Sequence, residues 1–139
     1  MIKQYQFKKE ERLKSAVEID NLFKNCRYFT RNPIKLIYAI RKEKVQNPLQ
    51  VVITVPSRKF RNAADRNRIR RKMREIYRLN KHRIYSVMVQ DLNIRLGIIY
   101  TGDDKAPEYE LLEAGLLQCM AKLNSYIRKL SGGDVTDLH

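Results

Sequence analysis

The sequence predicts a small α/β (α+β) sandwich of two layers, in which helices pack on a mixed sheet. Apolar residues alternate with a period of two in three short stretches, as they do in strands. They recur at helical spacing in two further segments and in a longer one near the C-terminus. The predicted order is helix, strand, strand, long basic helix, a segment that fits strand or helix, strand, and helix. The length of 139 residues suits an arm at 1–14, one domain at 15–131 and a disordered tail at 132–139.

The N-terminal part of the chain predicts an arm followed by a short helix. Residues 1–14 are polar and basic, and we expect them to extend along the domain with Phe7 as the anchor. Ser15 and Glu18 form a capping-box pattern, in which each side chain serves a free backbone N–H of the first turn. A helix should therefore begin after Ser15 and run to about Asn25.

Three strands are expected, and no strand is expected before residue 34. The first covers 34–41, where the alternation is clearest. The run 49–55 is apolar and β-branched on both faces, which predicts a central strand covered on both sides. The third covers 94–100. Residues 82–93 fit either state and favour a helix, and the last helix should start near Asp104.

A strongly basic stretch follows the second strand. Between Ser57 and Arg83 the chain holds twelve Lys or Arg against two acids, within a protein whose formal net charge is +14. Asn62 suits the N-cap of a helix that should run to about Lys81. Four apolar residues should share its core-facing side: Ile69, Met73, Ile76 and Tyr77. A stripe of arginines should adjoin them: Arg66, Arg70 and Arg74.

This charge pattern predicts a protein that binds a polyanion. The planar fork of arginine fits phosphate oxygens and base edges better than an ammonium group does. A solvated helix face usually interleaves charges of both signs, and this stretch does not. A sequence pI of about 10.0 narrows the partner to nucleic acid or an anionic membrane surface. No apolar run approaches the ~20 residues that span a bilayer, so we expect no membrane partner.

Catalytic and metal-binding patterns are absent from the sequence. His82 and His139 have no Ser, Cys or carboxylate at the spacing of a catalytic triad. Cys26 and Cys119 lie far apart, without a second ligand at metal-site spacing, and we expect reduced thiols. The first residues lack the apolar region of a secretory signal. We therefore expect a cytoplasmic protein that binds no cofactor by itself and is a monomer in the free state.

The basic motif resembles the signature of a known family. Residues 57–78 read SRKFRNAADRNRIRRKMREIYR and are similar to the central motif of the bacterial ribonuclease P protein component. That family shows a small residue, two basic residues, Asn-Ala, and then Arg-Asn-Arg followed by an aliphatic and two basic residues. The segment from Phe7 to Phe23 also resembles the opening of the family. The likeness extends over about residues 7–127.

The resemblance implies an RNA-binding subunit of a ribonucleoprotein that removes the 5′ leader of precursor tRNA. It implies a left-handed crossover of the strand–basic helix–strand unit, against the usual right-handed rule. It also implies that Mg²⁺ ions, held mainly by the catalytic RNA, carry out the hydrolysis. The residues implied to bind the catalytic RNA are Arg58, Lys59, Arg61, Arg66, Asn67, Arg68, Arg70, Arg71, Arg74 and Arg78. The residues implied to line a cleft for the leader are Ile19, Phe23, Tyr38, Ser57 and Lys59.

Two other functions also fit the charge. A structural RNA-binding protein, such as a small ribosomal protein, would share the basic helix but would need no leader cleft. A DNA-binding regulator is disfavoured, because strands rather than a second helix flank the basic helix. Phe23 and Tyr38 could stack on the bases of a single strand or pack in the core, and the sequence leaves both roles open.

Overall fold

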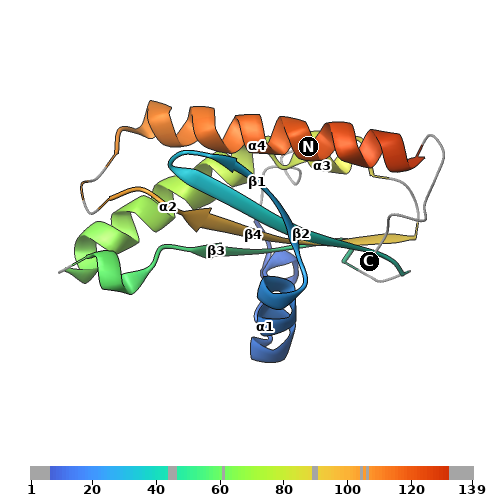
Figure 1. Ribbon diagram of the computed structural model, residues 1–139, viewed down its shortest axis with the longest axis horizontal. Coiled ribbons are helices and arrows are strands. Elements are labelled where there is room, and N and C mark those ends of the chain that lie inside the picture. The colour runs from blue at the N-terminus through green and yellow to red at the C-terminus, as the bar shows by residue number, and fades with distance from the viewer. Residues whose placement is uncertain are drawn as a thin grey trace.

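The protein folds as a four-stranded mixed sheet with helices on both faces, as the computed structural model shows (Figure 1). The structure describes residues 7–43, 47–60, 62–88, 91–103, 105 and 107–131, with the backbone alone at Lys59 and Ser131. The strands are β1 (Arg27–Arg31), β2 (Ile34–Lys42), β3 (Leu49–Thr54) and β4 (Leu92–Tyr100), in the order β1-β2-β4-β3. The helices are α1 (Ala16–Lys24), α2 (Ala63–Asn80), α3 (His82–Tyr85) and α4 (Tyr109–Ser131), with 3₁₀ turns η2 (Lys9–Glu11) and η3 (Ser57–Lys59). The predicted mixed α+β class is confirmed.

A strand that the sequence analysis missed forms one edge of the sheet. β1 pairs antiparallel with β2 through a hairpin that contains the cis peptide bond Asn32–Pro33. Both ends of β1 are charged, and only Phe29 in it is half-buried. The short run therefore lacks the apolar alternation that identifies longer strands. Its place at the edge explains how it can form without burying much surface.

The second predicted strand lies at the other edge of the sheet, so its central placement was wrong. β3 pairs with β4 alone, in parallel, and β4 holds the central position instead. The free edge of β3 is covered by the N-terminal segment, because Arg12 bridges to Val51 and the Leu13 N–H donates to the Val51 carbonyl at 2.9 Å. The side chains of β3 are apolar on both faces because they meet both cores: Val51 belongs to the larger one, and Val52 packs against the smaller one. The N-terminal segment covers the edge itself. Such edges otherwise expose unpaired backbone groups.

Residues 7–14 are therefore part of the packed domain, and the predicted boundary at residue 15 is wrong for them. Phe7 packs edge-on against Tyr77 with ring centroids 5.3 Å apart, which confirms its role as the anchor. Leu13 and Glu11 are buried. Residues 1–6, the predicted tail at 132–139 and the predicted helix start at Asp104 lie outside the described residues.

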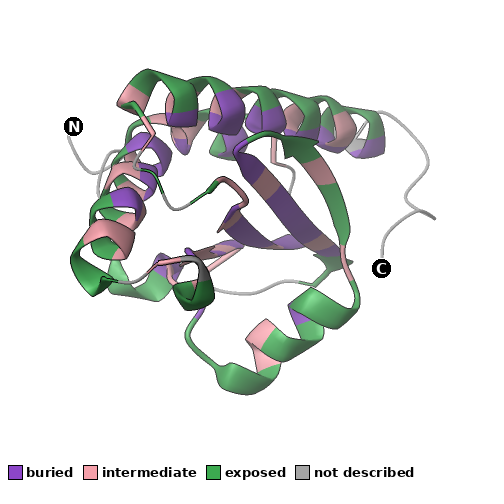
Figure 2. Ribbon diagram, turned by 60° about the vertical axis from the view of Figure 1, so that its left-hand side comes forward, coloured by how far each residue is buried: buried purple, intermediate pink, exposed green. Residues whose placement is uncertain are grey.

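The two faces of the sheet carry cores of very different size. α4 and α2 cover one face, where the apolar stripe predicted for the basic helix is fully buried. On the other face α1 alone buries a small cluster of Leu13, Leu22 and Ile37. Figure 1 shows α4 and α1 on opposite sides of the sheet, and Figure 2 shows a nearly continuous buried stripe on α4 but little burial on α1. The larger core fixes α2, and the smaller one leaves much of α1 exposed.

The predicted N-cap of the basic helix is present in the structure. The Asn62 side chain accepts hydrogen bonds from the backbone of Ala64 at 2.8 Å and of Asp65 at 3.3 Å, as an N-cap should. The helix predicted over 82–93 is present only as the short α3, and β4 begins at Leu92, two residues before the predicted start. The predicted parallel crossover from β3 through α2 to β4 is present. Its left-handed sense stays a prediction of the resemblance.

Candidate nucleic-acid interface

The arginine stripe of α2 lies half-buried beside the apolar face of the helix. Arg66, Arg70 and Arg74 project from successive turns, next to the side that packs on the sheet. The Nε atom of each is buried and has no hydrogen-bond partner among the described residues. A buried N–H group that lacks an acceptor is costly, so each of these Nε groups stands where a hydrogen-bond partner would stabilise it. The stripe therefore offers donors to an acceptor from outside the protein.

Arg12 from the N-terminal segment joins two of these arginines. A cavity of about 200 Å³ lies between this segment, β3 and α2, and Arg12, Arg70 and Arg74 all line it. We call these three residues the arginine cluster. The other described residues that line it are Phe7, Leu13, Lys14, Val51, Val52 and Ile53, and none of these carries a carboxylate.

The electrostatics of the arginine cluster favour an anion. Burial lowers the pKa of Arg74, and the positive charges of Arg12 and Arg70 lower it further. The Arg12 guanidinium also lies 5.2 Å from the centre of the Phe7 ring, which helps to hold it in place. Arg12 was not among the residues expected to bind RNA, since it is 58 positions from Arg70 in the chain. The packing of the N-terminal segment along β3, with its bridge from Arg12 to Val51, brings the two together.

The remaining basic residues of α2 are more exposed, and some are paired within the helix. Arg78 lies 2.6 Å from the carboxylate of Glu75, and Arg68 lies 3.8 Å from Asp65. Asn67, Arg71 and Arg58 are exposed to solvent, while Arg61 and the side chain of Lys59 lie outside the described residues. The structure therefore divides the expected RNA-binding set into a half-buried stripe and an exposed outer surface.

A second charged cluster contains its own ion pair, and its Glu11 is the chain neighbour of Arg12. Lys81 Nζ lies 2.7 Å from both carboxylate oxygens of Glu11, and the Tyr85 hydroxyl donates to the same carboxylate at 2.9 Å. Both charges are buried, and we call these three residues the Glu11 cluster. Burial and the Glu11 charge raise the pKa of Tyr85. A cavity of about 580 Å³ adjoins it, lined by Lys8, Glu11, Asn47, Lys81, His82, Tyr85 and Ser86.

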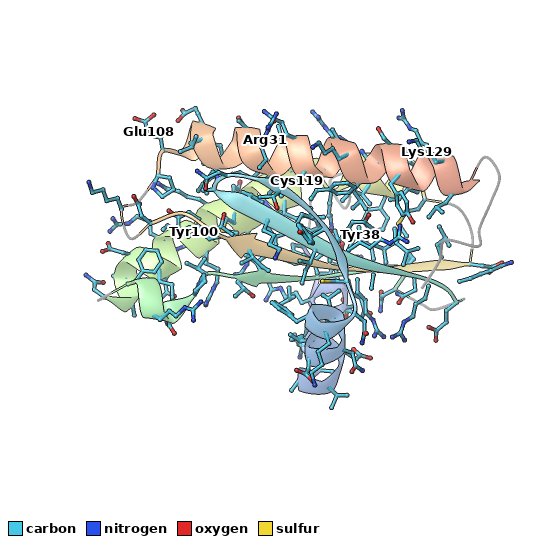
Figure 3. The ribbon with its side chains drawn as sticks, in the orientation of Figure 1. Arg31, Tyr38, Tyr100, Glu108, Cys119 and Lys129 are labelled. Atoms are coloured by element: carbon cyan, nitrogen blue, oxygen red, sulfur yellow. The ribbon has the colours of Figure 1, made fainter. Side chains whose placement is uncertain are left out.

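The expected leader cleft needs one correction. Tyr38 is 4 % exposed and packs between Phe29 and Tyr126, with ring centroids 5.3 and 5.7 Å away. Figure 3 shows it on the side of β2 that faces α4, opposite α1. Tyr38 therefore cannot share a surface with Ile19 and Phe23. The sequence alternation had separated the two faces of β2 correctly, but it could not show which face α1 would cover.

Ile19 and Phe23 lie on α1 and therefore on the other side of the sheet from Tyr38. Leu22 packs at the centre of the small core, and a Cβ atom on Gly97 of β4 would lie 3.6 Å from it. One flank of α1 faces Arg95, which lies 3.2 Å from Glu18. At ~100° per residue, Ile19 and Phe23 point to the opposite flank. Phe23 is 42 % exposed, and the half-buried Ile19 packs against the small core, as Ile99 does.

The pairing of β2, β4 and β3 places a row of side chains on the α1 face of the sheet, on the side of Ile19 and Phe23. Lys35 of β2 pairs with Ile99 of β4, and Ile99 pairs with Thr54 of β3. Paired residues project from the same face of a sheet. The chain continues from Thr54 to the exposed Ser57 in η3, so that expected residue follows directly from the end of the row. We call Ile19, Phe23, Lys35, Ile99 and Thr54 the α1 surface.

The described residues offer little chemistry for catalysis. No group of three His, Cys, Asp or Glu side chains among them could hold a metal ion. His82 is half-buried and lines the larger cavity together with Glu11, whose carboxylate binds Lys81 and Tyr85. In the same part of the chain, no helix is long and apolar enough to cross a membrane.

Comparison with known proteins identifies the family. The model of the ribonuclease P family matches residues 7–124, which include the arginine cluster and the α1 surface. The chain belongs to the family of bacterial ribonuclease P protein components. The ribonuclease P protein component of Porphyromonas gingivalis is 29 % identical over 116 residues, which cover 83 % of this chain and 84 % of that protein. The component of Petrotoga mobilis is 39 % identical over 75 residues, which cover 54 % and 60 %.

Solved structures of the family share the fold. The ribonuclease P protein of Staphylococcus aureus superposes with a TM-score of 0.63 at 17 % identity, covering 81 % of this chain and 94 % of that one. The protein of Thermotoga maritima, solved in complex with 1-(4-fluorophenyl)-2-thiourea, gives a TM-score of 0.56 at 19 % identity. That match covers 76 % of this chain and 94 % of that one. At such identities the likeness concerns the fold.

Proposed function

We propose that this protein is the subunit of a ribonuclease P that binds the catalytic RNA and the 5′ leader of precursor tRNA. The arginine cluster is the observation that carries the proposal. Three guanidinium groups line one cavity in which none of the described lining residues is acidic, and their stripe extends along α2 to Arg66. RNA phosphates would supply the missing acceptors in the bidentate geometry that arginine favours. We assign the catalytic RNA to this stripe and to the exposed residues of α2.

The α1 surface supports the assignment of the leader. Single-stranded RNA binds to surfaces that combine aromatic rings with positive charge. Phe23 offers an exposed ring, and Lys35 offers a charge on the adjoining sheet. A structural RNA-binding protein would need the arginines of α2 but no such surface.

We assign the hydrolysis to Mg²⁺ ions held mainly by the RNA. Such ions activate water and stabilise the charge that develops on phosphate and leaving oxygens. The protein's own residues would contribute affinity and position. No group of three His, Cys, Asp or Glu among the described residues could hold a metal ion, which agrees with this assignment.

The test of this function is a reconstitution. The purified protein is added to a bacterial ribonuclease P RNA at low Mg²⁺ and physiological salt, and cleavage of a precursor tRNA is followed. We expect faster cleavage and tighter binding of precursor than of mature tRNA. Binding of RNA without either effect would instead support a structural RNA-binding protein.

Two aromatic variants separate the leader role from a role in the core. Phe23→Ala should weaken binding of precursor tRNA more than of mature tRNA, since the ring is exposed on the α1 surface. Tyr38→Ala should lower the melting temperature and affect both RNAs equally, because truncating a buried aromatic costs about 3–5 kcal/mol. The opposite pattern would return Tyr38 to the leader site and contradict the placement of Phe23.

A further inference from the structure

An exposed tyrosine stands at the edge of the α1 surface. Tyr28 of β1 pairs with Ile37 of β2, and Ile37 belongs to the small core under α1. Tyr28 therefore projects from the α1 side of the sheet, while its neighbour Phe29 projects to the other side and stacks on Tyr38 at 5.3 Å. Tyr28 is 59 % exposed, and it belongs to neither core cluster. Burial thus does not account for the ring.

A lysine holds this ring in place. The Lys35 Nζ lies 4.5 Å from the centre of the Tyr28 ring, within the range of a cation–π contact. Lys35 pairs with Thr30 on one side and with Ile99 on the other, so it lies on the same face as Tyr28. The contact leaves most of the ring accessible, and it places an ammonium group next to an exposed aromatic surface.

The Tyr28 ring adjoins the α1 surface, because it contacts Lys35, the positively charged member of that surface. The row Thr30, Lys35, Ile99 and Thr54 crosses all four strands, about 14 Å at ~4.8 Å per strand. No carboxylate belongs to this row. The acids of α1 are occupied elsewhere, Glu18 with Arg95 at 3.2 Å and Asp20 with Lys24 at 3.0 Å.

We propose that Tyr28 and Lys35 form a further base-stacking subsite for single-stranded RNA, beyond Phe23. A base would stack on the accessible surface of the Tyr28 ring, and Lys35 would contact a neighbouring phosphate. The occupant is a leader segment upstream of the nucleotides at Phe23, so the inference rests on the proposed function. An edge strand with an exposed aromatic ring and a positive charge suits single-stranded RNA, whose unpaired bases can stack and whose phosphates are negatively charged.

The test measures binding of precursor tRNAs to the reconstituted complex, with leaders lengthened one nucleotide at a time. In the wild-type complex, affinity should rise again when the leader reaches Tyr28. Tyr28→Ala should remove that last gain, about 5- to 150-fold for one stacked base, and leave shorter leaders unaffected. Tyr28→Phe should keep it. A fluorescent base analogue at the corresponding leader position should be quenched by the wild-type protein and by Tyr28→Phe, but not by Tyr28→Ala.

Matched variants make the outcomes separable. Lys35→Gln should weaken long-leader binding and reduce its salt dependence, whereas Lys42→Gln at the far end of the same strand should not. Equal losses for all leader lengths, or no loss with Tyr28→Ala, would overturn the subsite while leaving the proposed function intact. If the wild-type complex gains nothing from any leader, the leader assignment itself fails, and the subsite with it.

Discussion

Two neighbouring residues of the N-terminal segment, Glu11 and Arg12, belong to two clusters in which positive side chains have different roles. Glu11 points into a cluster that is complete, with Lys81 and Tyr85 bound to its carboxylate. Arg12 points into a cavity where it meets Arg70 and Arg74 and no carboxylate. The chain has 29 Lys and Arg but only 15 Asp and Glu, so many of its cations have no acidic partner within the protein. A cation that the chain itself neutralises stabilises the fold, whereas cations gathered without an acid mark the place of an external anion.

The largest effect should come from opening the Glu11 cluster. Glu11→Ala removes the carboxylate that binds the buried Lys81, and breaking a buried pair this way costs about 3–5 kcal/mol of unfolding free energy. Chemical denaturation measures the loss. Asp20→Ala, which removes an exposed partner of Lys24, should change stability by at most about 0.5 kcal/mol.

A second variant tests whether the loss belongs to the pair. Replacing both residues, as Glu11→Gln with Lys81→Met, should recover part of the stability, because no uncompensated charge is then buried. If Glu11→Ala proves as mild as Asp20→Ala, the contrast between the two clusters does not hold.

The next effect should come from the arginine cluster and should fall on RNA binding. The triple variant Arg12→Ala, Arg70→Ala, Arg74→Ala should bind the catalytic RNA more weakly. The slope of log K against log salt should flatten by about 0.7–0.9 for each phosphate that the protein no longer neutralises. Stability in denaturant should hold or rise, since three mutually repelling charges are removed.

The matched control removes the same charge from α4. Lys122→Ala, Arg128→Ala, Lys129→Ala should leave the salt slope near that of the wild type. Equal losses from both triple variants would mean that net charge alone binds the RNA.

A smaller effect is expected at the start of α2, where the protein again supplies its own partner. Asn62→Ala removes the acceptor for two backbone N–H groups and should cost about 1 kcal/mol of stability. Asn62→Asp should keep the cap. Thermal melts compare the variants, and the salt slope of RNA binding should change little. A large change in that slope would show that Asn62 contacts RNA directly.

The smallest effect should come from the exposed pair on α2. A hydrogen bond from Arg78 lowers the pKa of Glu75 in the folded protein, so the pair stabilises the fold above the ordinary pKa of about 4.3. Its contribution is lost as the pH falls through the lowered pKa. The melting temperatures of wild type and Glu75→Gln should therefore differ slightly at neutral pH and converge in acid. A difference that grows in acid would contradict this assignment.

Local patterns predicted the helices and the arginine stripe because each depends on residues close in sequence. The cap at Asn62 and the buried side of α2 are properties of one segment, and the structure confirms them. The placement of β3, the course of residues 7–14 and the burial of Tyr38 depend on which strands pair and which face each helix covers. These features depend on contacts between residues far apart in the chain, and the alternation within one strand does not predict such contacts. Arg12 and Tyr28 were missed for this reason, since a bridge and a register give them their neighbours.

The docking of the N-terminal segment on β3 has a thermodynamic consequence for RNA binding. Arg12 joins Arg70 and Arg74 only while residues 7–14 lie along the strand, held by Phe7, Glu11 and the Leu13 backbone. If the segment is docked in a fraction of the molecules, the apparent dissociation constant for RNA rises by the inverse of that fraction. The Glu11 cluster would therefore affect the proposed RNA binding indirectly, by holding Arg12 beside Arg70 and Arg74. Stabilising the docked segment would raise the affinity for RNA only until nearly all molecules are docked.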